Sequence, residues 1–398
     1  MKIFYRFYQW ILRGVSPLLP WRIPTLIEGP GALENVPESM ANLAMKKALI
    51  VTDQGLVDSG LVRHLQKILE SHQCPYHLFA ETEANPSIET ILKAKTAYLN
   101  AGCDGLIAFG GGSPIDCAKV LGASIARPKK PIEKMKGILK IRKAIPPLIA
   151  IPTTAGTGSE ATLAAVVSNP KTKEKYAIND HALIPNVAIL DAELTVKLPP
   201  SLTAYTGMDA LTHAIEAAIG RSNTKDTWAW SEKAITLIHQ ALVRATTHPE
   251  DLNARAQMLK ASYYAGLSFT RAYVGNIHAI AHTLGGFYRL PHGYTNAVIL
   301  PRVLRAYGDS VVKPLAKMAR TLYPELNSTS DQTCANHFIE WIESLNSRFN
   351  IPQHIPEIQT SDIAIMAKRA YKEANPLYPV PMIFSLAQFK EIYHQLKA

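Results

Sequence analysis

Short apolar segments that alternate with helical patterns are the feature of this sequence that most restricts its fold. The segments with strand character occur at residues 47–52, 76–79, 106–109, 148–151 and 187–190. Helical periodicity lies between them, for example at residues 60–71 and 88–101. Strands that are apolar on both faces are typical of a mainly parallel sheet covered by helices on either side. We therefore expect an α/β domain in the first half of the chain.

Two glycine-rich turns follow two of these strands directly. The first is GGGSPIDCAK at residues 110–119, and the second is IPTTAGTGSE at residues 151–160. Consecutive glycines let a phosphate approach the backbone, and a helix that begins near Pro114 would point its first amides at the anion. The hydroxyls of the second turn can bind phosphate or ribose, or they can cap the next helix; they are Thr153, Thr154, Thr157 and Ser159. The GxGxxG pattern is absent, so the turns predict a different kind of nucleotide site, with a purely structural tight turn as the alternative.

Asp53 ends the first of these strands. A carboxylate in that place can accept hydrogen bonds from ribose hydroxyls and repels a 2′-phosphate, which favours NAD over NADP. A single aspartate at a strand end is also a common turn residue. The two phosphate-type turns favour the nucleotide interpretation.

From residue 200 onward, helical periodicity replaces the strand patterns. Asp209 and His213 stand four residues apart in one helical stretch, so they share a face and lie about one turn apart. His278 and His282 repeat this spacing, and His292 follows after two glycines interrupt the helix. One carboxylate and three or four imidazoles suit Fe²⁺, Zn²⁺, Co²⁺ or Ni²⁺ better than Ca²⁺ or Mg²⁺. The spacing predicts a metal site but does not distinguish His278 from His282 as a ligand.

Residues 1–22 form a basic, apolar extension. Its polar residues recur every three or four positions and so form one stripe on a helix, while apolar residues cover most of the remaining surface. The polar residues are Lys2, Arg6, Gln9 and Arg13, and the apolar ones are Ile3, Phe4, Phe7, Trp10, Ile11 and Leu12. A cleaved signal peptide does not fit, because charges interrupt the apolar stretch and no small-residue cleavage site follows. Two interpretations stay open: a helix packed on this protein or on a partner subunit, and an amphipathic helix on an anionic membrane.

The chain has 42 lysines and arginines against 32 aspartates and glutamates, a formal net charge of +10. Many of the basic residues gather at residues 127–143, where a solvated basic surface or a second membrane contact is expected. No zinc-finger or RNP-type motif accompanies them, so we expect no nucleic acid partner. The four cysteines lack metal spacing, and no apolar run is long enough to cross a bilayer. These features predict a cytoplasmic protein, either free or peripheral at the membrane surface.

Four motifs occur together and in order: GGGSPIDCAK, IPTTAGTGSE, GMDALTHAIEA, and HAIAHTLGG followed by PHGYTNAVILP. They resemble the signatures of the iron-containing (group III) alcohol dehydrogenases, over roughly residues 24 to 398. The resemblance implies an N-terminal Rossmann-like parallel-sheet domain and a C-terminal all-helical domain, a dehydroquinate synthase-like fold of the α/β plus all-α class. The expected segments are the extension 1–23, a dinucleotide-binding domain 24–199 and a helical metal-binding domain 200–398.

The resemblance also implies roles for individual residues. It makes Asp209, His213, His278 and His292 the metal ligands, and it places His282 beside the substrate and the nicotinamide, where it can relay a proton. The cofactor-binding residues that it implies are Asp53, Asn85, Gly111, Gly112, Ser113, Asp116, Thr153, Thr154, Thr157 and Lys175. One departure from the family's pattern is Arg271, which either faces the pocket and favours an anionic substrate or lies on the outer face of its helix.

We therefore expect a metal-dependent, NAD-linked alcohol dehydrogenase that transfers a hydride between an alcohol or aldehyde and nicotinamide. Fe²⁺ is the expected ion and Zn²⁺ the alternative, with the ion acting as a Lewis acid. The alternatives are a zinc polyol (glycerol-type) dehydrogenase and a dehydroquinate-synthase-like lyase, which would need a phosphate-binding set of lysines and arginines. The complete ligand set argues against a non-catalytic protein that keeps only the fold, because such a protein should have lost at least one of the four ligands. The resemblance also implies a homodimer.

Overall fold

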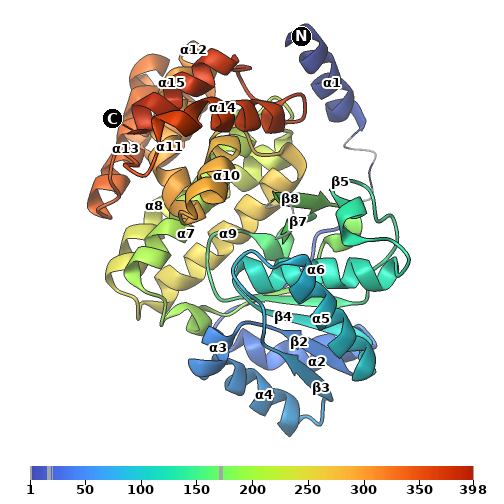
Figure 1. Ribbon diagram of the computed structural model, residues 1–398. Coiled ribbons are helices and arrows are strands. Elements are labelled where there is room, and N and C mark those ends of the chain that lie inside the picture. Colours follow the sequence, from blue (N-terminus) through green and yellow to red (C-terminus); the bar gives the residue numbers. More distant parts are fainter. Residues whose placement is uncertain (1, 16–18, 20, 170–173, 398) are drawn as a thin grey trace. The chain divides into compact units, whose positions relative to one another are not determined.

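The computed structural model describes residues 2–15, 19, 21–169 and 174–397, whose helices and strands are drawn in Figure 1. The chain divides into two compact units. The α/β unit comprises Pro20–Leu198 and Glu250–Tyr263, and the helical unit comprises Met1–Leu19, Pro199–Pro249 and Tyr264–Ala398. The predicted combination of a parallel-sheet domain with a helical domain is confirmed.

The α/β unit is built on a six-stranded sheet in the order β1-β9-β6-β4-β2-β3, with every neighbouring pair parallel. Its strands are β1 (Thr25–Glu28), β2 (Ala48–Val51), β3 (Tyr76–Phe79), β4 (Gly105–Gly110), β6 (Leu148–Pro152) and β9 (Val187–Leu190). Five of them lie where the sequence predicts strands, and β1 was not predicted. A smaller sheet, also not predicted, contains β5 (Gly137–Ile138), β7 (Ala164–Asn169) and β8 (Glu174–Asn179), with β7 antiparallel to β8.

Both faces of the larger sheet are buried, which explains its continuous apolar strands. Leu49 and Val51 of β2 join a core with residues of α5 (Ile88–Asn100) and α6 (Gly112–Ala126). Ala48 and Ile50 point to the other face and join a core with α2 (Val36–Asn42) and α4 (Leu61–Ser71). The short helix α3 (Gln54–Asp58) follows β2 directly. Figure 1 shows α5 and α6 together over one face of the sheet.

The helical unit is organised around α7 (Pro200–Ile219), in which every residue from Gly207 to Ile219 is buried. A helix buried on all sides needs neighbours all round. α8 (Lys225–Thr247) and α11 (His292–Tyr307) pack on α7, and α10 (Asn276–Tyr288) packs on α11 and α14 (Thr360–Ala374). The other helices are α12 (Asp309–Leu322), α13 (Asp331–Arg348), α15 (Leu386–Lys397) and α9 (Leu252–Ala272), whose first part belongs to the α/β unit.

The N-terminal helix α1 (Lys2–Val15) directs Arg6 and Gln9 of its polar stripe toward the protein, whereas Lys2, Arg13 and most of its apolar side chains are exposed. Arg6 donates to the carbonyl oxygens of Val380 and Pro381 at 2.6 and 2.8 Å, and Gln9 donates to that of Tyr378 at 2.8 Å. The largest exposed fractions on the other side are 87% for Ile3, 69% for Trp10, 62% for Phe4 and 56% for Phe7. Among the residues that the structure describes, no helix is both long and apolar enough to span a bilayer.

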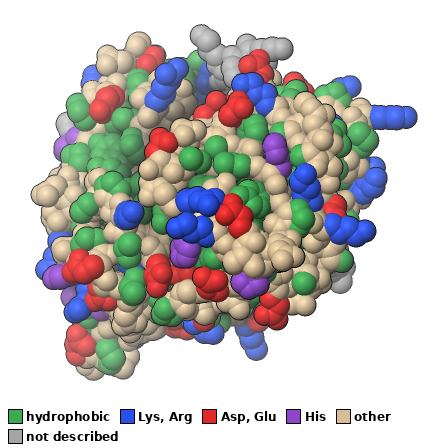
Figure 2. Space-filling view, turned by 90° about the horizontal axis from the view of Figure 1, so that it is seen from below, with side chains coloured by type: hydrophobic (Ala, Val, Ile, Leu, Met, Phe, Trp, Pro, Cys, Tyr) green, Lys and Arg blue, Asp and Glu red, His purple; other side chains and the backbone are tan. Residues whose placement is uncertain are grey.

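Most basic side chains of residues 127–143 are exposed, as a solvated basic surface requires. Two of them bind carbonyl oxygens of the same segment: Arg127 donates to Ile141 at 2.6 Å, and Lys130 donates to Lys140 at 2.7 Å. Figure 2 shows one face of the molecule, on which basic and acidic side chains are interspersed. The positive net charge is therefore not gathered into one continuous patch on that face.

Candidate active site

In the α/β unit the two glycine-rich turns lie against each other. A Cβ atom on Gly112 would come within 2.9 Å of the Thr157 side chain, and one on Gly111 within 3.3 Å of the Thr154 hydroxyl. A side chain at either glycine would therefore crowd the threonine that faces it, most closely at Gly112. The half-buried hydroxyls of Thr154 and Thr157 thus stand beside the first amides of α6, which is the combination of donors that an anion binds.

Further predicted cofactor residues surround this pair of turns. The Ser113 hydroxyl accepts a hydrogen bond from the Asn85 backbone amide at 3.2 Å. Asp116 accepts from the Ser159 hydroxyl at 2.7 Å and from the Val166 amide at 2.9 Å, so its carboxylate anchors the second turn to β7. Asn85, Ser113 and Asp116 therefore share one hydrogen-bonded neighbourhood with the turns.

Of the remaining predicted cofactor residues, Thr153 joins the two turns to each other, whereas Asp53 and Lys175 lie on other elements. Asp53 follows β2 and caps α3, because its carboxylate accepts from the Leu56 amide at 3.0 Å. Thr153 is buried, and its amide donates to the Gly110 carbonyl at 3.0 Å. Lys175 is exposed on β8. The turn-residue role of Asp53 is observed, while its role toward ribose stays a prediction.

Lys119 is a residue of the first turn motif that the sequence analysis did not single out. It is buried, and its Nζ lies within 3.2 Å of four oxygen atoms that share its three N–H groups: the hydroxyls of Ser159 and Thr162 and the carbonyls of Thr162 and Ala164. Burial lowers its pKa to about 8, although Asp116 opposes this. A buried lysine with this many acceptors ties the second turn to α6, and its position next to the apolar residues Ala118, Val120 and Leu121 was the available signal.

In the helical unit three helices carry the predicted metal ligands. α7 carries Asp209 and His213, α10 carries His278, and α11 begins with His292. One ligand atom each from Asp209, His278 and His292 lies within 4.8 Å of the others. The Nε2 atoms of His278 and His292 lie 3.8 and 3.6 Å from Asp209 Oδ1.

These separations fit a single ion. Ligands that each lie about 2.1 Å from a metal in tetrahedral geometry are about 3.4 Å apart. A carboxylate oxygen with imidazole nitrogens is a donor set for Fe²⁺ or Zn²⁺. Burial holds the pKa of His278 well below its ordinary value, so its ring is neutral, as a metal ligand requires.

His213 is not part of this three-residue group, although it lies next to it. Its ring stacks on that of His278, with centroids 4.4 Å apart and planes 25° apart, and on Phe269 at 4.2 Å. The structure therefore brings together three of the four predicted ligands. The ligand role of His213 stays a prediction.

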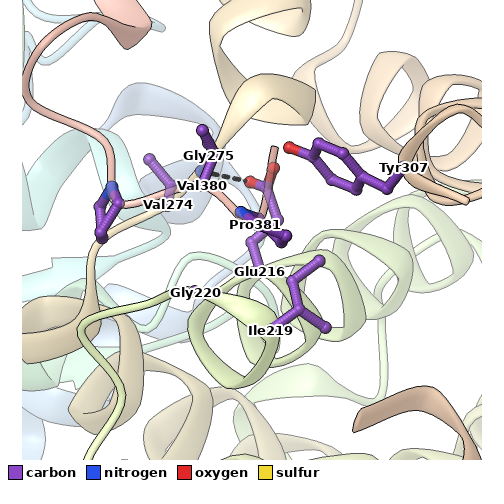
Figure 3. A pocket seen from close by; sticks show the side chains of 9 residues that line it. Glu216, Ile219, Gly220, Val274, Gly275, Tyr307, Val380 and Pro381 are labelled. Carbon is purple, nitrogen blue, oxygen red and sulfur yellow. Dashed lines mark hydrogen bonds between the residues drawn. The ribbon is translucent and has the colours of Figure 1, made fainter. Parts of the chain in front are cut away.

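Glu216 supports His278 from the side away from the other ligands. Its carboxylate accepts from His278 Nδ1 at 2.6 Å, from the Gly275 amide at 2.9 Å and from the Ile277 amide at 2.8 Å. Figure 3 shows this carboxylate at Gly275, with Tyr307 pointing toward it and Val380 and Pro381 lining the same small hollow. Burial raises the pKa of Glu216 to about 7, against the bonds from the amides. A carboxylate on Nδ1 orients the ring, so that Nε2 faces the ligand group.

Asn296, like Lys119 and Glu216, is not among the predicted site residues. Its amide nitrogen lies 2.6 Å from Asp209 Oδ1 and 3.3 Å from the Nε2 atoms of His278 and His292. Both Glu216 and Asn296 could have been found from helical spacing. Glu216 stands seven residues after Asp209, and Asn296 stands four residues after His292.

His282 lies beside the ligand group without belonging to it. Its ring stacks on that of His292, with centroids 5.2 Å apart, and meets that of His278 edge-on at 5.9 Å. The guanidinium of Arg271 lies 4.7 Å from the centre of the Trp230 ring, so a cation–π contact within the helical unit accounts for this side chain. No anionic substrate is needed to explain Arg271.

Comparisons with known proteins identify the family of the chain. Residues 24–192 match the family model described as iron-containing alcohol dehydrogenase, and residues 203–396 match the model of the C-terminal part of that family. Alcohol dehydrogenase 4 of Saccharomyces cerevisiae is 39% identical over 88% of this chain and 91% of its own length. The NAD-dependent methanol dehydrogenase of Bacillus methanolicus is 35% identical over 88% of this chain and 92% of its own length.

Among solved structures, a 1,3-propanediol oxidoreductase matches with a TM-score of 0.91 and 34% identity, covering 94% of this chain and 99% of that one. The chain belongs to the iron-containing alcohol dehydrogenase family. It is an oxidoreductase of the alcohol dehydrogenase class, as the sequence predicts, and this confirms the main interpretation over the lyase.

Proposed function

We propose that the chain interconverts a small alcohol or diol and its aldehyde with NAD(H), at a divalent iron held by Asp209, His213, His278 and His292. The observation that carries this proposal is the convergence of Asp209, His278 and His292 from three helices within 4.8 Å. Relatives named for methanol and 1,3-propanediol support a small, uncharged substrate. The alternative, a zinc polyol dehydrogenase, differs from this proposal in its metal ion, so the same metal analysis tests both.

The residues of this chain divide the work of the reaction. A bound divalent ion would act as a Lewis acid on the substrate oxygen, and NAD would accept the hydride from the substrate carbon. Asp209 contributes the single negative charge of the ligand set, and Glu216 orients His278 through Nδ1. When an alcohol is oxidised, its hydroxyl proton must leave, and we assign its acceptance to His282, which stacks on His292.

We assign NAD binding to the α/β unit. Gly111, Gly112, Thr154 and Thr157 would hold the pyrophosphate at the start of α6, and Asp53 would bind ribose. Asn85, Ser113, Asp116, Thr153 and Lys175 complete the proposed set. The corresponding domains are residues 24–199 for the dinucleotide and residues 200–398 for the metal.

The test is metal analysis of the purified protein, followed by NADH absorbance with a panel of alcohols and aldehydes. Chelator should abolish activity, and Fe²⁺ should restore it better than Zn²⁺. His282→Ala is expected to keep its metal and lose turnover, whereas His64→Ala, at an exposed histidine of α4, should change neither. Full activity in a demonstrably metal-free protein would overturn the proposal, and loss of metal from His282→Ala would make that residue a ligand.

We also propose that the chain works in the cytoplasm at an anionic membrane surface, to which α1 attaches it. Ile3, Phe4, Phe7 and Trp10 are exposed on one side of α1, and Lys2 and Arg13 are exposed as well. α1 contains no acidic residue. Exposed aromatic and aliphatic side chains beside cations match the boundary between anionic headgroups and acyl chains.

Vesicles of phosphatidylcholine with and without phosphatidylglycerol test this attachment by co-sedimentation. The full chain should bind only the anionic vesicles, Trp10→Glu should not bind, and Leu99→Glu, at an exposed leucine of α5, should bind normally. Equal binding by the chain and Trp10→Glu would overturn the proposal. We propose a homodimer as well, on the family resemblance. A monomer in sedimentation equilibrium would contradict this proposal. If the wild-type chain is a dimer and Trp10→Glu is a monomer, α1 lies in the subunit interface instead of on a membrane.

A further inference from the structure

A second carboxylate–histidine pair lies next to the metal-ligand group. His282 Nδ1 is 2.6 Å from Glu373 Oε1, and this bond joins α10 to α14. The side chains of His282 and Glu373 are 30% and 33% exposed, so water competes with the bond only in part. The pair has the same arrangement as His278 with Glu216, but its histidine is not a predicted ligand.

This hydrogen bond decides which nitrogen of His282 faces its other neighbours. A carboxylate accepts, so Nδ1 carries the hydrogen and Nε2 is left as the nitrogen that can accept a proton. The bond also limits rotation of the ring, which stacks on His292 with planes 15° apart. Glu373 therefore determines how the His282 ring is oriented.

Glu373 is itself held in place by Tyr378. The Tyr378 hydroxyl donates to the same oxygen, Glu373 Oε1, at 2.9 Å. Burial keeps the pKa of Tyr378 well above its ordinary value, so the hydroxyl remains a donor throughout the neutral range. Without this bond the Glu373 carboxylate could rotate away from His282.

The segment that carries Tyr378 is in turn bound by α1. Gln9 donates to the carbonyls of Pro376 and Tyr378 at 3.1 and 2.8 Å. Arg6 donates to the carbonyls of Val380 and Pro381. A continuous set of hydrogen bonds therefore runs from α1 through residues 376–381 and Glu373 to His282.

We propose that Glu373 is a positioning residue for His282, and that Tyr378 and α1 hold Glu373 in its place. The inference rests on the proposed role of His282 as the proton acceptor. It extends the role of the N-terminal extension from a surface attachment to a support of the active site.

The test is a double-mutant cycle with Glu373→Gln and His282→Ala. Glu373→Gln is expected to lower kcat about tenfold or more, with metal content and KM for the alcohol unchanged. The double variant should be no slower than His282→Ala, because Glu373 acts only through His282. Glu391→Gln, at an exposed glutamate of α15, is the matched control and should retain wild-type kcat.

The possible results distinguish the positioning role of Glu373 from the proton-acceptor role of His282. Multiplicative losses in the double variant, or an unchanged kcat in Glu373→Gln while His282→Ala is slow, would overturn the positioning role and leave the proposed function intact. An unchanged kcat in His282→Ala would instead refute the proton-acceptor role in the proposed function. If Glu373→Gln does not fold, Tyr378→Phe replaces it in the cycle, with an expected loss of about threefold. Arg6→Ala should also lower kcat, as Glu373→Gln does. An unchanged kcat in Arg6→Ala would show that α1 does not support Glu373.

Discussion

Replacing Glu216 with glutamine should weaken metal binding while leaving the three grouped ligands in the chain. The carboxylate accepts three hydrogen bonds with two oxygens: Oε2 accepts from His278 Nδ1 and the Gly275 amide, and Oε1 accepts from the Ile277 amide. A glutamine keeps only one accepting atom. Its least costly orientation places the oxygen at the Oε2 position, which preserves the bond to His278 but leaves the Ile277 amide facing another donor.

Two effects of different size follow. The bond from His278 loses its ionic partner, and loss of such a support typically weakens metal affinity about 10- to 100-fold, or about 1.4 to 2.8 kcal/mol. The unsatisfied buried amide of Ile277 should lower the free energy of unfolding of the metal-free protein by about 1 to 3 kcal/mol. The first effect concerns the bound ion and the second does not, so they can be measured separately.

Competition with a chromophoric chelator measures the dissociation constant for Fe²⁺ or Zn²⁺, and urea denaturation of the metal-free protein measures the second effect. Glu340→Gln, at an exposed glutamate of α13, is the matched control and should change neither quantity. A Glu216→Gln protein with a wild-type dissociation constant would refute the reasoning, because the carboxylate would then not support His278.

Other predictions concern both units of the chain. Asp209→Asn removes the only carboxylate of the ligand group, so the protein should purify largely without metal; a full metal complement would show that the group does not hold the ion. Lys119→Met removes the donor that four oxygen atoms share and should lower the free energy of unfolding by roughly 3 kcal/mol, to be measured against wild type in urea. Burial raises the pKa of Glu160 to about 7, so the folded state binds its proton more tightly than the unfolded state does, and this group stabilises the fold at low pH and loses that effect as pH rises through 7. The melting temperature of Glu160→Gln minus that of wild type should therefore increase from pH 5 to pH 8. A difference that does not change with pH would contradict the raised pKa of Glu160. Of the four cysteines only Cys74 is partly exposed, so a thiol reagent should label one site in the native protein and four after denaturation; rapid native labelling of a second site would be inconsistent with the packing.

Local patterns in the sequence were sufficient for much of the fold and for part of the site. Continuous apolar strands, glycine-rich turns and helical periodicity each reflect contacts within a few residues, so they predicted β2, β4, β6 and the helical character of the second half. The i, i+4 spacing of Asp209 and His213 places both on α7 for the same reason. The smaller sheet was missed, because β5 has only two residues and β7 is fully buried only at alternate positions, so neither forms a continuous apolar run like those of the larger sheet.

Tertiary structure alone decided which side chains meet. The partners of the histidines, Glu216 for His278 and Glu373 for His282, stand 62 and 91 residues away from them in the chain, and no periodicity relates them. The sequence also left open which side of α1 faces the protein. In the structure the side with Arg6 and Gln9 does, because these two side chains donate to the carbonyls of residues 376–381. Hydrogen-bonding requirements between distant segments become visible only when packing brings those segments together.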